Sequence, residues 1–352
     1  MSKATGPEVA SPARDSLEFG NNRLLPMLYG PHDSHLARIE TALGVHLANR
    51  GNRVLLSGEE AAIRIAAGIL KDLYRRIEAG EEIGVGDVEG ALRLSGAIPG
   101  IAPATRARQA GDVDPADLHR ITTRNRVIQP RSRMQGVYIE ALRRSVMTFG
   151  IGPAGTGKTY LAVAMAVSRM LAGEVDRIVL SRPAVEAGEN LGFLPGDLKE
   201  KVDPYLRPLY DALYDMMPAE QVEKRLMSGQ IEVAPLAYMR GRTLSHACVI
   251  LDEAQNTTPM QMKMFLTRLG ENARMTICGD PSQVDLPEKT ESGLAQALRI
   301  LEGVEGIATV RFSERDVVRH PLVARIVEAY DRQTGREARG RGAAENHVRR
   351  PK

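Results

Sequence analysis

The chain has 352 residues, of which 43% are hydrophobic, and carries a formal net charge of +3. This length allows two or three domains with a sizeable core, whereas the charge is too small to indicate a nucleic-acid-binding protein by itself. No apolar run approaches the roughly 18 residues that span a bilayer, and the first residues lack the apolar core of a signal peptide, so we expect a cytoplasmic protein without membrane contact.

The N-terminal part predicts a small α+β domain. Residues 1–16 are small and polar and predict a disordered arm. Residues 17–94 then carry short apolar segments with strand or helix spacing. They predict a strand at 24–30, a helix at 34–43, strands at 45–48 and 53–57, and a helix at 59–79. This order resembles the KH fold of RNA-binding proteins.

A KH domain clamps a nucleic-acid backbone with a G-x-x-G loop between two helices. The corresponding segment here is Gly30-Pro31-His32-Asp33, in which a carboxylate replaces the second glycine. Two interpretations stay open for this domain: it contacts RNA, or it only packs against the following domain or mediates assembly.

Two segments have the composition of flexible chain. Residues 95–119 are rich in proline, alanine and glycine and predict a linker. Residues 332–352 form a basic, glycine-containing tail that we expect to be disordered. Basic residues cluster in this tail and also from Arg120 to Arg133. The tail is a candidate for RNA contact, although a bare charge run is more often a solvated terminus.

The region between them, residues 120–331, predicts a nucleotide-binding domain. An apolar run at 146–151 predicts a strand, and residues 160–171 predict a helix. The loop between matches G-x-x-x-x-G-K-[ST] and consists of Gly152, Pro153, Ala154, Gly155, Thr156, Gly157, Lys158 and Thr159. In such a loop the backbone N–H groups bind phosphate, the lysine reaches the β- and γ-phosphates, and the hydroxyl of Thr159 ligates Mg²⁺.

A second motif follows a strand predicted at 247–251. Asp252 and Glu253 come directly after this continuous apolar run, which is typical of a strand buried on both faces of a parallel sheet. We expect Asp252 to hold Mg²⁺ and Glu253 to activate the water that attacks the γ-phosphate. The pair therefore predicts ATP hydrolysis and not only ATP binding.

A third motif follows the strand predicted at 275–278. Gly279-Asp280-Pro281-Ser282-Gln283 places polar groups at the carboxyl end of that strand, where open α/β sheets bind ligands. We expect Gln283 to sense the γ-phosphate. Further strands are predicted at 178–181, 231–235 and 308–312, and Cys248 and Cys278 are expected to be small buried hydrophobic side chains.

These motifs together resemble the PhoH-like ATPases. The segments that carry the resemblance are residues 150–162, 181–189, 192–197, 251–256 and 279–283. The resemblance implies an α/β fold, namely a RecA-like P-loop NTPase with a parallel sheet like the first lobe of superfamily 1 helicases, here preceded by the KH-like domain. It also implies ATP and Mg²⁺ as cofactors and a link to phosphate starvation and RNA metabolism. The family pattern further matches Gln135 and Tyr138. The amide of Gln135 is expected to recognise adenine by hydrogen bonds to the edge of its ring.

A second helicase lobe, which would supply arginines to the bound ATP, is not expected after residue 312. An arginine finger raises turnover by about 10³ to 10⁵, so we expect a neighbouring subunit to supply it in a homo-oligomeric ring such as a hexamer. The candidates, each of which is also a plausible surface ion-pair partner, are Arg240, Arg242, Arg315 and Arg319. Arg182 is a candidate for phosphate or nucleic-acid contact, or for a structural ion pair.

Three functions are compatible with these features. The first is an RNA-linked ATPase that remodels RNA or assists an endoribonuclease in ribosomal RNA maturation. The second is a nucleotide-gated scaffold with slow hydrolysis. A small-molecule kinase is the third and is disfavoured, because Glu253 and Gln283 suit water activation and γ-phosphate sensing. The sequence has no separate carboxylate cluster of the kind that a two-metal nuclease needs, so RNA cleavage would require a partner.

Overall fold

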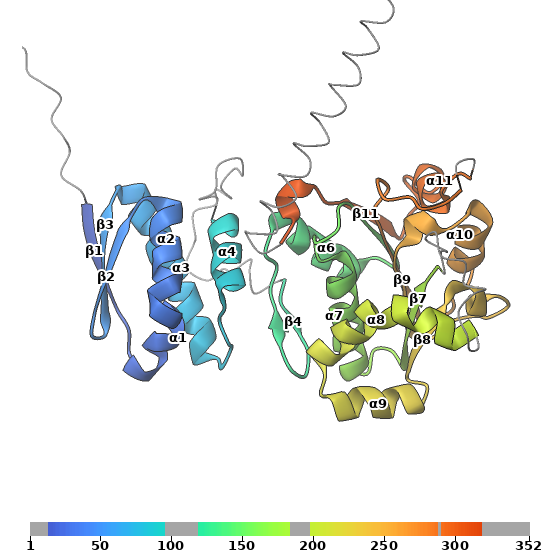
Figure 1. The fold of residues 1–352 in the computed structure, drawn as a ribbon, viewed down its shortest axis with the longest axis horizontal. Coiled ribbons are helices and arrows are strands. Elements are labelled where there is room, and N and C mark those ends of the chain that lie inside the picture. The colour runs from blue at the N-terminus through green and yellow to red at the C-terminus, as the bar shows by residue number, and fades with distance from the viewer. Residues whose placement is uncertain (1–12, 96–118, 184–197, 288–289, 319–352) are drawn as a thin grey trace, which may run out of the picture.

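The computed structural model describes residues 13–95, 119–183, 198–287 and 290–318. These residues form a small N-terminal α+β unit and a larger α/β unit, with helix α4 (Val85–Leu94) on the side of the small unit that faces the larger one (Figure 1).

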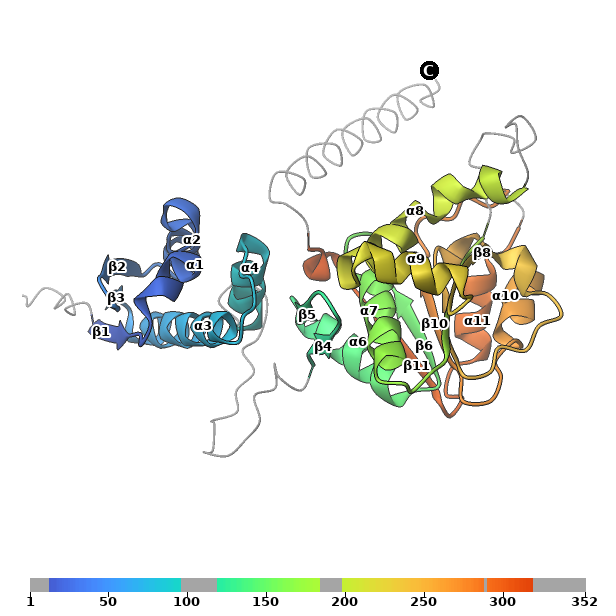
Figure 2. The same cartoon turned by 90° about the horizontal axis from the view of Figure 1, so that it is seen from below.

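The N-terminal unit packs helices on one face of a three-stranded antiparallel sheet (Figures 1 and 2). The strands lie in the order β1-β3-β2, and their bounds are Ala13–Glu18 for β1, His46–Arg50 for β2 and Arg53–Gly58 for β3. The helices are α1 (Leu25–Tyr29), α2 (Ser34–Leu43) and α3 (Glu60–Glu78), and α4 packs against α2 and α3. Val54 and Leu56 of β3 are buried under the helices while Leu55 between them is exposed, which is the alternation of a half-covered sheet.

Two expectations for this unit are wrong. Residues 24–30, expected as a strand, form the end of a 3₁₀ helix and α1, because Pro26 suits a first helical turn and Leu25, Leu28 and Tyr29 then share one buried face. The expected disordered arm also extends too far, since β1 begins at Ala13 and pairs with β3. Its side chains are polar except for Ala13 and Leu17, so the backbone pairing leaves little trace in the sequence.

The larger unit contains a six-stranded parallel sheet in the order β11-β6-β10-β9-β7-β8. The strands are β6 (Met147–Ile151), β7 (Arg177–Arg182), β8 (Ile231–Pro235), β9 (Ala247–Leu251), β10 (Arg274–Gly279) and β11 (Ile307–Arg311). All six expected strands are confirmed. A short hairpin, β4 (Ile121–Thr122) with β5 (Val127–Ile128), precedes the sheet.

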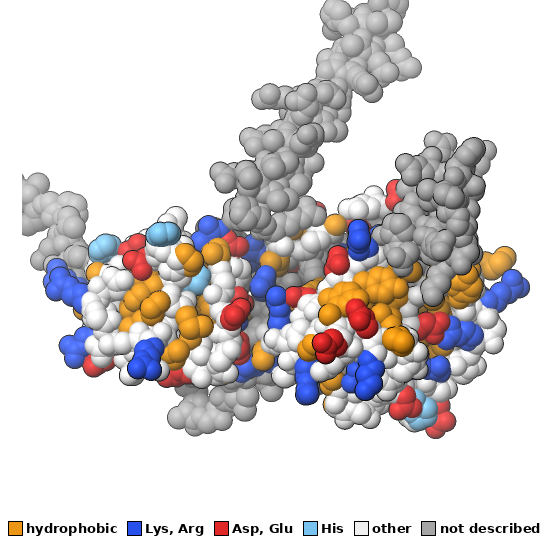
Figure 3. Space-filling view, turned by 60° about the horizontal axis from the view of Figure 1, so that its bottom comes forward, with side chains coloured by type: hydrophobic (Ala, Val, Ile, Leu, Met, Phe, Trp, Pro, Cys, Tyr) orange, Lys and Arg blue, Asp and Glu red, His pale blue; other side chains and the backbone are white. Residues whose placement is uncertain are grey.

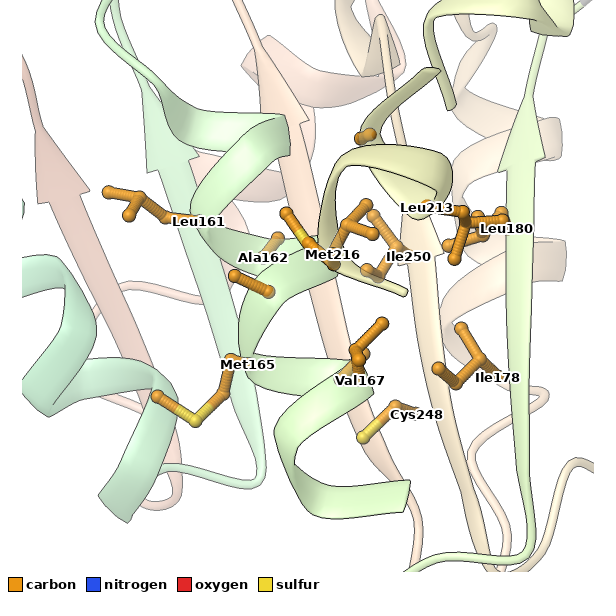
Figure 4. Packing of buried hydrophobic residues seen from close by; sticks show 14 of the residues in the cluster. Leu161, Ala162, Met165, Val167, Ile178, Leu180, Leu213, Met216, Cys248 and Ile250 are labelled. Atoms are coloured by element: carbon orange, nitrogen blue, oxygen red, sulfur yellow. The ribbon is translucent and has the colours of Figure 1, made fainter. Parts of the chain in front are cut away.

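Helices cover both faces of this sheet. One face carries α6 (Arg133–Arg144), α7 (Lys158–Leu171), α8 (Leu198–Met216) and α9 (Ala219–Met227). The other face carries α10 (Pro259–Leu266) and α11 (Gly293–Ile300). Successive side chains of β7 therefore enter different cores: Ile178 and Leu180 pack with α7 and α8, as Figure 4 shows, whereas Val179 packs on the α10 side.

The strand order brings the expected motifs together. β10 lies between β6 and β9, so the loop after β6, Asp252 after β9 and Asp280 after β10 all lie at one edge of the sheet. Carboxyl ends of parallel strands are where open α/β sheets bind ligands. Cys248 and Cys278 are both buried, as predicted. Burial raises the pKa of the Cys278 thiol to about 12 and that of the Cys248 thiol to about 11.

Candidate nucleotide-binding site

The loop between β6 and α7 depends on glycine at two positions. Gly152 has a φ of 143°, and a Cβ on it would lie 2.6 Å from the carbonyl oxygen of Phe312 at the end of β11. Gly157 has a φ of 83° and serves as the N-cap of α7, which begins at Lys158. Only glycine adopts these conformations at little cost, and they direct the loop around the positive end of the helix dipole.

The Lys158 ammonium lies inside this loop. It donates to the carbonyl oxygens of Gly152 at 2.5 Å and Pro153 at 2.7 Å, and only 9% of the residue is exposed. Burial lowers the pKa of Lys158, an effect opposed by nearby groups that include Asp280, Asp252 and Glu253. A cation with this surrounding is suited to bind a phosphate that enters the loop.

The two expected magnesium ligands are in direct contact. The Thr159 hydroxyl donates to Asp252 Oδ1 at 2.6 Å, and Asp252 is 7% exposed. Burial raises the pKa of Asp252, while the Thr159 hydrogen bond lowers it. Within the described residues no group of three or more His, Cys, Asp or Glu side chains forms a metal cluster. Mg²⁺ is usually held by one or two protein oxygens together with phosphate oxygens and water, so this hydroxyl and carboxylate fit Mg²⁺·ATP.

The Glu253 carboxylate is held on both sides. Its Oε1 lies 3.4 Å from Arg182 Nη2 at the end of β7, and its Oε2 accepts from Gln255 Nε2 at 2.5 Å. Gln255 Oε1 in turn accepts from the backbone N–H of Asp280 at 3.0 Å. Contacts thus connect the carboxyl ends of β7, β9 and β10. Gln255 has no role in the sequence argument, and its position two residues after Glu253 was the available signal.

Asp280 is a second side chain that the sequence argument left without a role. Its Oδ1 accepts from the N–H and the hydroxyl of Ser282, whereas Oδ2 is buried and, among the described residues, has no hydrogen-bond partner. The Ser181 hydroxyl at the end of β7 is in the same situation. Gln283, expected to sense the γ-phosphate, is exposed in the turn after β10, and its N–H donates to Asp280 O.

Gln135 contacts the phosphate-binding loop from α6. Its Nε2 donates to Thr156 O at 2.9 Å, its Oε1 accepts from the N–H of Arg131 at 2.6 Å, and the residue is 5% exposed. Both ends of the amide are therefore engaged within the protein. Tyr138 is fully buried against Phe312 and Cys278, so its ring belongs to the core.

The arginine candidates differ in their contacts. Arg242 forms a two-point contact with Glu232, at 2.6 and 2.7 Å, which is a structural ion pair. Arg240 and Arg315 are exposed. Arg319 lies outside the described residues, as do most of the linker and the tail.

A strand, a glycine loop with Lys158 and Thr159, and a carboxylate at the end of a parallel strand together define a P-loop ATPase domain. The model of the PhoH-like protein family matches residues 127–331, which is more than half of the chain. The chain therefore belongs to the PhoH-like protein family.

Relatives match over most of the chain. A PhoH-like protein of Bacillus subtilis is 49% identical over 308 residues, which is 87% of this chain and 93% of the relative. A PhoH-like protein of Mycobacterium bovis is 47% identical over 87% of this chain and 84% of its own. Protein PhoH of Escherichia coli is 45% identical over 63% of each chain.

Solved structures resemble only part of the fold. The SWI2/SNF2 ATPase core of Sulfolobus solfataricus matches with a TM-score of 0.28 and 15% identity, over 42% of this chain and 30% of its own. The Pif1 helicase of Candida albicans matches with a TM-score of 0.26 and 12% identity, over 51% of this chain and 39% of its own.

Within the described residues no helix has the length and apolar character to cross a membrane.

Proposed function

We propose that this protein hydrolyses ATP with Mg²⁺ and couples turnover to RNA metabolism, by remodelling RNA or by assisting an endoribonuclease in ribosomal RNA maturation. The observation that carries the hydrolytic part is the 2.6 Å contact between the Thr159 hydroxyl and Asp252, with Glu253 as the next residue. Thr159 and Asp252 would hold Mg²⁺, which would neutralise phosphate charge when bound, and the Glu253 carboxylate could accept a proton from water.

The RNA part is supported by the N-terminal unit. The order of elements is one strand, helices α1 and α2, two strands and helix α3, and the loop at Gly30 lies between α1 and α2. We propose that this unit is KH-like and binds an RNA backbone at the loop. Figure 3 shows acidic and basic side chains interspersed on the face that it displays, so contact at a defined loop suits this surface better than a broad basic patch.

The test is ATP turnover of the wild type, Lys158→Ala and Glu253→Gln, with and without single-stranded and structured RNA. We expect RNA to raise turnover in the wild type and both substitutions to abolish it, with Glu253→Gln retaining ATP binding. Turnover that is slow and indifferent to RNA would favour the alternative, a nucleotide-gated scaffold, and phosphate transfer to a metabolite would favour a kinase.

We further propose a homo-oligomeric ring, such as a hexamer, in which a neighbouring subunit supplies the arginine finger. Arg240 and Arg315 are the candidates because both residues are exposed. Substituting the finger lowers kcat and leaves the Kd for ATP nearly unchanged. Light scattering with and without nucleotide measures assembly, and turnover that does not depend on protein concentration in a monomeric sample would contradict the ring.

A further inference from the structure

Glu253 has an unusual backbone conformation for the residue that would activate water. Its φ is 50° and its ψ is 39°, the left-handed region that a side chain with a Cβ rarely adopts. Such a conformation persists only where the surroundings determine it. The surroundings are Arg182 from β7 on one side and Gln255 on the other.

The two contacts on the Glu253 carboxylate differ in length and in exposure. The amide of Gln255 donates at 2.5 Å and is itself fixed by the Asp280 N–H. The Arg182 contact, at 3.4 Å, is longer than the roughly 2.7–2.9 Å of a strong charge-assisted hydrogen bond. The Arg182 and Glu253 side chains are 22% and 37% exposed, so the ion pair is partly accessible to solvent. A competing anion would therefore displace Glu253 from Arg182 more readily than from Gln255.

A general base needs an oxygen within hydrogen-bond reach of the attacking water. In this structure one carboxylate oxygen faces a guanidinium and the other an amide donor. A guanidinium binds a phosphate with two parallel N–H contacts at least as well as it binds a carboxylate. An RNA phosphodiester at the end of β7 would thus withdraw Arg182 and leave the Glu253 Oε1 for water.

We propose that Arg182 is a positioning residue that holds Glu253 away from the attacking water until an RNA phosphodiester takes its guanidinium. The proposal rests on the proposed RNA-linked ATPase and adds the contact through which RNA accelerates turnover. Gln255 stays on the other carboxylate oxygen in both states and keeps Glu253 next to Asp280.

The test compares kcat and KM for ATP in the wild type, Arg182→Gln and Arg182→Lys, with and without single-stranded RNA. We expect Arg182→Gln to raise the RNA-free kcat several-fold, to reduce RNA stimulation to about 1-fold, and to leave KM unchanged, because nothing then restrains Oε1. Arg182→Lys keeps the charge and should retain part of the stimulation. Arg299→Gln removes an exposed Arg–Glu pair on α11 and is the matched control, expected to match the wild type.

Gln255→Leu provides an independent arm in case Arg182→Gln folds poorly. It removes the second contact but leaves Arg182, so kcat should fall with and without RNA while the stimulation ratio is retained. A fall in the RNA-free kcat of Arg182→Gln with stimulation retained would overturn the proposal, because Arg182 would then support the productive position. No RNA stimulation in the wild type would instead refute the RNA coupling, and a raised basal kcat in Arg182→Gln would still assign the restraint to Arg182.

Discussion

Asp252 combines burial with the negative charge that the proposed Mg²⁺ site needs. Burial raises its pKa, so the folded protein binds a proton there more tightly than the unfolded chain does. The stability from this group is present at low pH and is lost as the pH rises through its folded pKa. Asp252→Asn should therefore raise the Tm at neutral pH, by about 2–4 °C for each kcal/mol relieved, while abolishing Mg²⁺-dependent turnover.

The measurement is thermal unfolding of the wild type and Asp252→Asn at a series of pH values. The two Tm curves should converge as the pH falls, because the wild-type carboxylate becomes neutral. An equal Tm difference at every pH would show that the substitution acts through packing and not through charge. Mg²⁺·ATP should also bind more weakly as the pH falls, because the metal needs the ionised carboxylate.

Gly152 permits a close approach that another residue would prevent. Gly152→Ala places a Cβ 2.6 Å from the Phe312 carbonyl oxygen, so the loop or the end of β11 must move. We expect a loss of at least about 2 kcal/mol in stability and a loss of ATP binding, measured by denaturant unfolding and nucleotide titration. Gly173→Ala is the control, since Gly173 also has a positive φ, 73°, but no described atom within 4 Å of its Cβ position. Similar losses in both variants would assign the effect to backbone conformation alone.

At the scale of elements, the sequence predicts the buried strands best. The run at 247–251 coincides with β9, because a strand covered on both faces is apolar throughout. The strand expected at 231–235 coincides with β8, although this edge strand carries the charged Glu232. The prediction of secondary structure fails where backbone hydrogen bonds or a few side-chain contacts determine the element. β1 is polar except at Ala13 and Leu17, and the apolar run that contains Pro26 fits a strand or a helix equally well.

The same limit applies to the site. Lys158, Thr159 and Asp252 lie together because their motifs follow strands whose order a P-loop fold determines. The partners of Gln135 and Gln255 depend on side-chain contacts between segments far apart in the chain, which no spacing in the sequence reveals.

The contacts of α6 with the phosphate-binding loop distinguish two roles for Gln135. If its amide supports the loop, Gln135→Ala removes the hydrogen bonds to Thr156 and Arg131 and weakens ATP and GTP equally, by about 1–3 kcal/mol. If the amide reads adenine, the ATP preference over GTP falls instead. Competition titrations with both nucleotides measure this, and the structure favours the first outcome because both amide ends are engaged.

For the whole molecule, α4 connects the N-terminal unit to the phosphate-binding loop. Arg93 of α4 donates to Val317 O at 2.9 Å, and the N–H of Val318 donates to Gly155 O at 2.9 Å. Arg131 packs against α4 at Gly86 and Gly90, and its N–H donates to Gln135, which contacts Thr156. Two routes of contact thus lead from one helix to the same loop.

Ion pairs support this contact. Arg76, buried in the N-terminal unit, binds Glu81 and Asp87, and the same two carboxylates contact Arg120 and Arg131 of the larger unit. Shared carboxylates of this kind orient two surfaces more than they stabilise them. Through α4, the RNA that we propose for the N-terminal unit can influence the loop. This requires that the position of α4 affects ATP binding.

Gly90→Val tests this coupling. A Cβ at Gly90 would lie 3.2–3.4 Å from the Arg131 backbone and side chain, so the larger valine side chain must push α4 away from residue 131. We expect ATP affinity to fall several-fold, since Arg131 and Gln135 move with the contact, while the intrinsic helix propensity of α4 improves slightly. Gly68→Val on α3 is the control, because no described atom lies within 4 Å of its Cβ position. Isothermal titration with ATP compares the two variants. Both variants make the same chemical change in a helix of the N-terminal unit, but only Gly90 contacts the segment that leads to the loop. Equal affinities of the two variants for ATP would therefore contradict the coupling.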